Sequence, residues 1–365
     1  IMPNMLNQLH SRYPDTAFWM DSMVVDNIEY GLSHANRGVT TSPTVMSDSI
    51  VAEPELWNER ILAMRKRFPQ KNQNELLWEV MYALAAERSQ LLLPLYHADA
   101  SIDGRFCIQG NVYDYMNVDK IIAQSARIMA TGKNLVMKIP TTAAGIIAME
   151  EIVYRGGSVM ATATSTVSQV LAAGAALYRG LVRRKAAGLS TEGIALACAM
   201  QLGLPEMCYT NYCRMHGLDV PAGALAYSSV AVAKKAYRLL LERYPLVTFV
   251  LSNFETDLHW TEFIGGRMML TMPVELIRKL DALEQIPEAR IDVDIEPAHL
   301  QALLDNVPFY AKAYEEDAMQ PEEFSSFEGF CRTVNIFMDI YEIGLNKVRK
   351  MLLPDPYKGD RAAKY

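Results

Sequence analysis

The stretch NLVMKIPTTAAGIIAMEEIVYRGGSVMATAT, residues 134–164, decides the fold of this protein. Residues 134–140 and 158–164 are continuous apolar runs, which are typical of strands buried on both faces of a parallel sheet. Between them, residues 142–157 have helical composition and end in a glycine pair, which predicts a helix stopped by glycine. A strand, a helix and a second strand in this order form a βαβ unit.

The alternation of strands and helices continues on both sides of this unit. Further helices are expected over residues 118–132 and 229–245, and a long helical region is expected to reach about Leu202. The expected strands are 17–21, 38–43, 104–112, 134–140, 158–164, 206–214, 246–254 and 267–273. Eight strands separated by helices predict an α/β fold, a closed (β/α)8 TIM barrel with extra helices. An open doubly wound sheet is the alternative, but the chain lacks the glycine-rich phosphate motifs that such sheets often carry.

We expect a single domain over residues 1–365, with a barrel core at about 17–285. Two helical insertions are expected at 53–100 and 175–203, and a helical C-terminal tail at about 286–365. The apolar spacing within the tail suits a helix that packs against the barrel or a partner subunit. We therefore also expect a homo-oligomer.

Composition narrows the classes of partner. The chain of 365 residues has a formal net charge of -7 and no basic run that would favour nucleic acid or an anionic membrane. No apolar stretch is long enough for a membrane span, and no signal peptide is evident, so a cytoplasmic protein is expected. The five cysteines lack CxxC spacing and the six histidines lack metal-ligand spacing. Neither a bound metal nor a cofactor is expected.

The reacting groups of a barrel enzyme lie at the carboxyl ends of its strands. The polar residues expected there are Asp21, Thr41, Ser42, Gln109, Asn111, Lys138, Thr162, Asn211, Arg214, Ser252 and Asn253.

Lys138 is the most informative of these residues, because it lies inside an otherwise apolar strand. Burial disfavours the charged form of an amine, and a neutral amine can attack a ketone to form a Schiff base. The iminium formed in this way is an electron sink for carbon–carbon cleavage. The alternative is a lysine that reaches solvent from the end of its strand.

The other candidates also have structural interpretations. Asp21 suits either proton transfer or the N-cap of the next helix. Gln109 suits either a structural amide or a group that holds a water or a substrate hydroxyl. Thr162 suits either a β-branched strand residue or a second partner for that water. Arg214 suits either anion recognition or a surface ion pair.

Taken together, these motifs resemble the transaldolase family. FWMDS (18–22) resembles the first strand with its acid–base aspartate, and GVTTSPTVM (38–46) resembles the turn after the second strand. The run 134–164 resembles the Schiff-base strand, its helix and the following strand.

The resemblance implies a metal-independent class I mechanism. Lys138 would attack the C2 carbonyl of a ketose, and Asp21 would take the C4 hydroxyl proton as the C3–C4 bond breaks. The dihydroxyacetone unit would then pass to an aldehyde acceptor or be released. Thr162 and Gln109 would hold the water that assists imine formation. The substrate contacts implied are Thr41, Ser42, Asn111, Asn211, Tyr212, Arg214, Ser252 and Asn253.

Three positions depart from the family pattern. Gln109 replaces a glutamate and resembles the fructose-6-phosphate aldolase branch, which cleaves rather than transfers. Ser42 replaces an asparagine, and Glu255 stands where an arginine that grips phosphate is expected. Arg214 matches the other anion-binding arginine. Because Glu255 would repel phosphate, we predict weaker binding of a sugar phosphate, or a substrate with another anionic or a neutral group.

Two other functions remain open from the sequence. These departures would also suit a catalytically retired barrel that binds a sugar or a partner protein. A Schiff-base lyase acting on keto acids would need a clamp for the substrate carboxylate, and the sequence reveals no such clamp.

Overall fold

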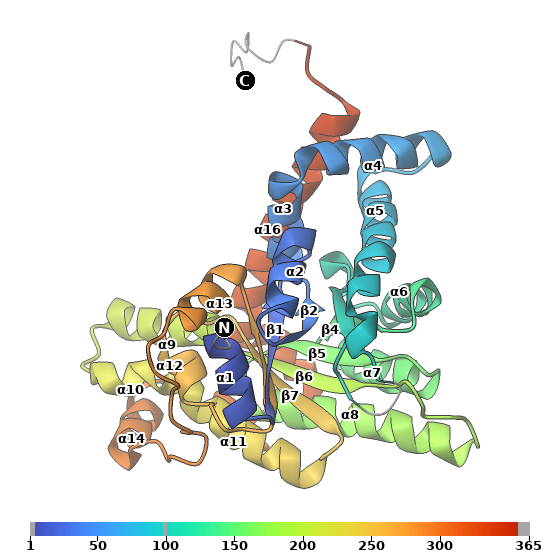
Figure 1. The fold of residues 1–365 in the computed structure, drawn as a ribbon. Coiled ribbons are helices and arrows are strands. Elements are labelled where there is room, and N and C mark those ends of the chain that lie inside the picture. The colour runs from blue at the N-terminus through green and yellow to red at the C-terminus, as the bar shows by residue number, and fades with distance from the viewer. Residues whose placement is uncertain (1–3, 98–100, 357–365) are drawn as a thin grey trace.

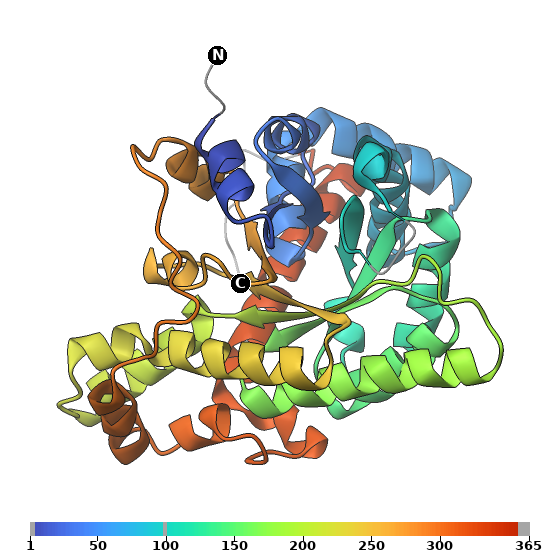
Figure 2. The ribbon, with the colours of Figure 1, turned by 60° about the horizontal axis from the view of Figure 1, so that its bottom comes forward.

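The computed structural model describes residues 4–97 and 101–356, and its strands form a closed parallel barrel (Figures 1 and 2). The strands follow the chain order: β1 (Thr16–Asp21), β2 (Asn36–Thr40), β3 (Arg105–Gln109), β4 (Leu135–Pro140), β5 (Val159–Thr164), β6 (Leu196–Gln201), β7 (Val247–Ser252) and β8 (Met268–Met272). β1 pairs with β8 and closes the ring. The prediction of a (β/α)8 barrel is confirmed.

Helices surround the strands and extend beyond them. They are α1 (Met5–Arg12), α2 (Val25–Leu32), α3 (Pro43–Ala52), α4 (Pro54–Arg67), α5 (Gln73–Arg88), η1 (Ser89–Leu95), η2 (Val112–Asp114), α6 (Val118–Thr131), α7 (Ala143–Tyr154), α8 (Val167–Ala186), α9 (Gly203–His216), α10 (Ala222–Ala226), α11 (Ser228–Arg243), α12 (Leu258–Thr261), α13 (Val274–Asp281), α14 (Pro297–Asn306), α15 (Tyr310–Tyr314), η3 (Pro321–Ser326) and α16 (Glu328–Leu352).

The core has two layers. Inside the barrel, Trp19, Val136, Met160 and other apolar side chains form one buried cluster. A larger cluster fills the space between the strands and the helices. β4, β5 and β6 are buried at every position, which explains why the strands read as continuous apolar runs rather than alternating ones.

The sixth strand differs from the prediction. Residues 206–214 belong to helix α9 rather than to a strand, and β6 lies earlier, within the region expected as the helical insertion 175–203. The segment folds as a helix because Tyr209 and Cys213, four residues apart, are buried on one face, while Thr210 between them is exposed and Asn211 and Tyr212 are partly exposed. Gly217 ends the helix in the left-handed conformation.

The region between β2 and β3 contains α3, α4, α5 and η1, so the helical content expected there is present up to Leu95. Residues 98–100 of the expected insertion 53–100, and residues 357–365 of the expected tail, lie outside the described residues. From residue 286 to 356 the chain is helical or irregular and adds no strand to the barrel. In the part of the chain that is described, no helix is both long and apolar enough to cross a membrane.

The long helix α16 lies against the carboxyl ends of the strands. Its first turn touches Ser165 after β5, because a Cβ added to Gly329 would lie 2.9 Å from the Ser165 Oγ. Further along, Lys347 donates a hydrogen bond to Ser47 in α3 (3.2 Å). The far end of α16 projects from the barrel together with α4 and α5 (Figure 1). A segment distant in sequence thus covers the end of the barrel where reacting groups are expected.

Candidate active site

Lys138 lies in β4, and only 4% of its surface is exposed. Its Nζ donates to the backbone oxygen of Thr41 at 3.3 Å, across the barrel mouth from the end of β2. The lysine therefore does not reach bulk solvent from its strand end, which was the alternative interpretation. It has no carboxylate ion-pair partner within 4 Å among the described residues, so its amine is held by a single neutral contact.

Asp21 ends β1 on the same rim of the barrel. Loss of hydration raises the pKa of its carboxyl above 3.8, and the Lys138 ammonium and a 3.0 Å hydrogen bond from the Thr40 hydroxyl offset part of that effect. Asp48 on α3 acts in the same direction as burial. Asp21 and Lys138 thus influence each other electrostatically, as a proton acceptor and an amine in one site would.

Gln109 and Thr162 flank Lys138 on the neighbouring strands β3 and β5, and they are 3% and 1% exposed. The side-chain oxygen and nitrogen of Gln109 and the hydroxyl of Thr162 have no hydrogen-bond partner among the described residues. An unmet buried polar group costs about 1–3 kcal/mol. Unpartnered groups on both sides of a buried amine are the arrangement expected where a water or a substrate is to bind.

A local distortion follows Thr162. The register between β5 and β6 shifts between Ala161 and Thr164, and Ala163 adopts a φ of +54°. This left-handed conformation is unfavourable for a residue with a Cβ. Bulges next to active sites change the direction of a side chain, and this one lies directly after Thr162.

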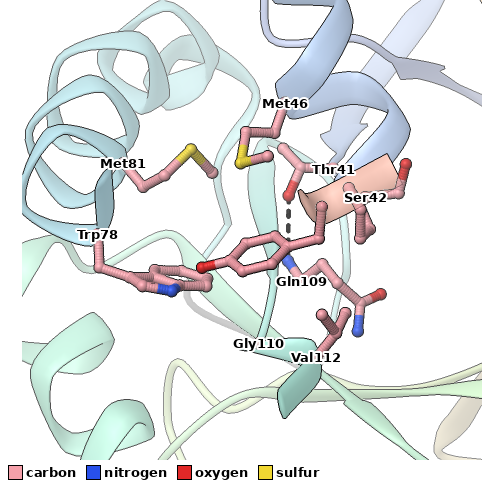
Figure 3. Close-up of a pocket in the computed structure, with 10 residues that line it drawn as sticks. Thr41, Ser42, Met46, Trp78, Met81, Gln109, Gly110 and Val112 are labelled. Carbon is pink, nitrogen blue, oxygen red and sulfur yellow. Dashed lines mark hydrogen bonds between the residues drawn. The ribbon is translucent and has the colours of Figure 1, made fainter. Parts of the chain in front are cut away.

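A small pocket lies next to Thr41 and Gln109, with about 240 Å³ of empty space including its mouth, and the described residues that line it do not include Lys138, Asp21 or Thr162. Thr41, Ser42, Gln109 and Met46 form one part of its wall, and Trp78 and Met81 of α5 lie opposite them (Figure 3). Figure 3 also shows the hydrogen bond from the Gln109 backbone N–H to the Thr41 hydroxyl, which measures 3.0 Å. Tyr341 of α16 completes the lining.

Comparisons with known proteins identify the family. The model of the transaldolase/fructose-6-phosphate aldolase family matches residues 18–324. The chain belongs to this family. It is 22% identical over 236 residues to a transaldolase of Thiobacillus denitrificans, covering 62% of this chain and 65% of that protein. It is 25% identical over 251 residues to a transaldolase of Frankia alni, covering 67% and 65% of the two chains. The match thus spans 65% of the length of each of these relatives.

The substrate contacts proposed for this transaldolase-family barrel fall into two groups. Thr41, Ser42, Asn111, Ser252 and Asn253 lie at or just after the ends of β2, β3 and β7. The side chains of several of them already form hydrogen bonds with nearby backbone N–H groups. The Ser42 hydroxyl caps α3, the Asn111 side chain accepts from the Tyr113 N–H, and the Asn253 side chain accepts from the N–H of Leu204 in α9.

The prediction for the second group was wrong. Asn211, Tyr212 and Arg214 were expected at the end of the sixth strand, but they lie in the middle and last turns of helix α9. Arg214 is exposed and donates to the neutral Asn211 side chain at 3.2 Å, so it lies on the surface as in the alternative interpretation, but its hydrogen-bond partner is an amide rather than a carboxylate. Tyr212 packs on the ring of His216. None of the three lies at the carboxyl end of a strand.

Two residues at the mouth were not anticipated as site residues. Gln201 is the true end of β6, and it was missed because the strand was assigned ten residues too late. Tyr341 was noted only as an apolar position of the tail, and its sequence distance from the barrel hid its place in the pocket. Among the residues described, no cluster of three or more histidine, cysteine or acidic side chains is suited to a metal ion.

Proposed function

We propose that this protein is a class I aldolase or transaldolase that breaks the C3–C4 bond of a ketose through a Schiff base on Lys138. The observation that supports this most is a buried amine with Asp21 nearby and unpartnered Gln109 and Thr162 side chains on both neighbouring strands. The family that the chain belongs to contains transaldolases and fructose-6-phosphate aldolases.

The reaction begins at the amine. The neutral Lys138 Nζ adds to the C2 carbonyl, and the resulting carbinolamine loses water to give an iminium. Gln109 and Thr162 can hold the departing water, because their side-chain polar atoms have no other partner in the described part of the chain. The same water position serves the reverse step, in which water attacks the iminium and frees the lysine.

Bond cleavage then needs a base. The Asp21 carboxylate takes the proton of the C4 hydroxyl, the C4 oxygen becomes an aldehyde, and the electrons of the C3–C4 bond move to C3 and the iminium nitrogen. The product on Lys138 is an enamine of dihydroxyacetone. It attacks an aldehyde acceptor, or it is protonated at C3 and hydrolysed.

Borohydride trapping tests the proposal. The protein is incubated with dihydroxyacetone, reduced, digested and analysed by mass spectrometry. A reduced adduct on the peptide that carries Lys138 is expected, and Lys138→Met should abolish both the adduct and the cleavage of ketoses. Lys133→Met, which removes an exposed lysine just before the same strand, is the matched control and should retain both activities. A protein without an adduct at Lys138 would refute the mechanism.

Transfer and simple cleavage are separated by a second measurement. Release of free dihydroxyacetone from a ketose is followed with and without an aldehyde acceptor. Gln109 favours release, because glutamine at this position resembles the fructose-6-phosphate aldolase branch, which cleaves rather than transfers. The small-molecule partners are thus a ketose and an aldehyde, while a homo-oligomeric state and a cytoplasmic location stay predictions.

A further inference from the structure

We propose that the site is built for a ketose whose far end is uncharged, and that Gln201, oriented by Thr333 of α16, binds a hydroxyl of that end. This inference rests on the proposed function. The region concerned is the β6–β7 rim, which we define as Gln201, Glu206, Asn253 and Glu255 at the carboxyl ends of β6 and β7.

The position of this rim follows from the barrel order. The strands β3, β4 and β5 carry Gln109, Lys138 and Thr162 around the carbonyl end of the substrate, and β1 carries Asp21 for the C4 hydroxyl. β8 ends in Met272, followed by Pro273, and neither side chain is polar. Carbon atoms beyond C4 therefore find further polar partners on the β6–β7 rim.

A terminal phosphate would find no free helix amides on this rim. The first N–H groups of a helix commonly bind phosphate, and α9 starts directly after β6. However, Gly203 N–H donates to the backbone oxygen of Asn253 (2.9 Å), and Leu204 N–H donates to its Oδ1 (2.6 Å). Pro205 has no N–H. The segment after β7 packs tightly on this turn, since a Cβ on Gly203 would lie 2.2 Å from the Glu255 Cγ.

The charges of the rim are also unfavourable for an anion. Glu206 and Glu255 both carry carboxylates there, and like charges repel. The buried His259 lies between them. Its Nδ1 accepts from the Glu255 backbone N–H (3.1 Å), so its Nε2 carries the proton and donates to Glu206 (2.7 Å).

Gln201 contributes an uncharged hydrogen-bond donor to the β6–β7 rim. It is 4% exposed, and its Oε1 accepts a 2.9 Å hydrogen bond from the hydroxyl of Thr333, which is fully buried in α16. Its amide nitrogen has no acceptor among the described residues. A buried amide that is fixed at one end and unpaired at the other suits a hydroxyl group, which both donates and accepts. Thr333 lies beyond residues 18–324, the part of the chain that the family model matches.

The first experiment compares one ketohexose with and without its phosphate. Cleavage of fructose and of fructose 6-phosphate is measured with the full chain. A kcat/KM at least tenfold higher for fructose is expected. The double variant Glu206→Gln/Glu255→Gln should narrow this preference severalfold, whereas Glu59→Gln, an exposed charge-matched control, should leave it unchanged. A phosphate that improves kcat/KM in the unmodified protein would overturn the inference.

The second experiment tests Gln201 and Thr333. Thr333→Val keeps the side-chain shape but removes the donor, and it should raise KM for fructose about fivefold with little change in kcat. Gln201→Leu should have a similar effect, and the double variant should be no worse than Gln201→Leu, because Thr333 acts through Gln201. Thr191→Val, at an exposed position, is the control. Additive effects of the two substitutions would contradict the positioning role.

The two proposals can fail separately. Dihydroxyacetone lacks the carbons that reach the β6–β7 rim, so its borohydride adduct on Lys138 should form equally well in Thr333→Val and in the unmodified protein. An intact adduct together with a preference for the phosphorylated ketose would remove only the present inference. Loss of the adduct in the unmodified protein would remove the proposed function itself.

Discussion

At the scale of single residues, the site is defined by polar groups that the fold leaves without partners. Gln109 and Thr162 are buried as deeply as the apolar core, yet their side-chain polar atoms meet no donor or acceptor from residues 4–97 and 101–356. Gln169, a buried glutamine near the same strand ends, is by contrast fully engaged with Thr166, Thr141 and Ala163. The difference separates a structural amide from one that is available to a substrate.

Gln109→Met should therefore separate stability from activity. Removing an unpartnered buried amide should raise the free energy of unfolding by about 1 kcal/mol. Ketose cleavage should fall roughly 100-fold, because the water that assists imine chemistry loses its holder. Gln169→Met is the matched control and should lower the free energy of unfolding by about 1–3 kcal/mol. Urea denaturation and cleavage assays measure both quantities; a Gln109→Met protein that is less stable would show that the amide is structural.

The raised pKa of Asp21 predicts that the free energy of unfolding depends on pH. Burial raises the pKa of its carboxyl above 3.8 in the folded protein, so the folded state binds this proton more tightly than the unfolded chain. The stability associated with Asp21 is present below pH 3.8 and is lost as the pH rises through the raised pKa. Asp21→Asn should hence be more stable than the unmodified protein above that range, and the difference should shrink in acid. Its rate of C–C cleavage should be nearly abolished.

The measurement is the free energy of unfolding of both proteins against pH, with the adduct to dihydroxyacetone as a second readout. Adduct formation does not require the C4 proton to leave, so Asp21→Asn should retain it. Equal stability of the two proteins at all pH values would contradict the raised pKa.

At the scale of elements, the start of α9 is fixed by a residue from another strand. Asn253 follows β7, adopts a φ of +62° and accepts the Leu204 N–H with its side chain. Asparagine tolerates this left-handed conformation better than most residues. One residue thus couples the end of β7 to the helix that follows β6.

Substitution of Asn253 should separate capping from backbone conformation. Asn253→Gly loses the side-chain hydrogen bond but accepts the positive φ, and it should cost about 1 kcal/mol. Asn253→Ala loses the bond and adds the strain of a Cβ at this φ, so it should cost about 2 kcal/mol or more. Denaturant unfolding of the two variants measures the difference. Alanine being as stable as glycine would show that the strained φ is not retained.

At the scale of the whole molecule, the part of α16 around Tyr341 lines the pocket and also covers it, and we call this part of the helix the roof. Tyr341 is 2% exposed, lines the pocket beside Thr41 and Gln109, and bonds through its hydroxyl to Asn74 of α5. Lys138 and its neighbours are closed off from solvent in this arrangement. We predict that part of α16 moves when a ketose reaches Lys138, as lids over active sites commonly do.

Hydrogen exchange tests this motion. Tyr341→Phe keeps the ring but removes the bond to Asn74, which is worth about 1 kcal/mol and corresponds to roughly fivefold faster opening. Amides of α16 should exchange faster by that factor while those of β4 and β5 do not change. Tyr178→Phe, at an exposed position on α8, is the control. Equal acceleration of the strands would indicate a general loss of stability rather than opening of the roof.

The sequence alone determined the barrel fold and pointed to the candidate site at its centre. Continuous apolar runs are typical of strands buried on both faces, and a lysine inside such a run is unusual enough to be singled out as a candidate. For this reason the strands that carry Asp21, Gln109, Lys138 and Thr162 were all predicted at the right place. These features depend on neighbours along the chain.

The position of the sixth strand and the path of α16 over the pocket could be known only from the tertiary structure. The aromatic and apolar residues at 206–214 suit a strand or a helix equally well, and the choice depends on which of them become buried. The contacts from Thr333 to Gln201 and from Tyr341 to Asn74 join residues 132 and 267 positions apart. Local patterns carry no information about such pairs, because the closed barrel and the path of α16 across it bring them together.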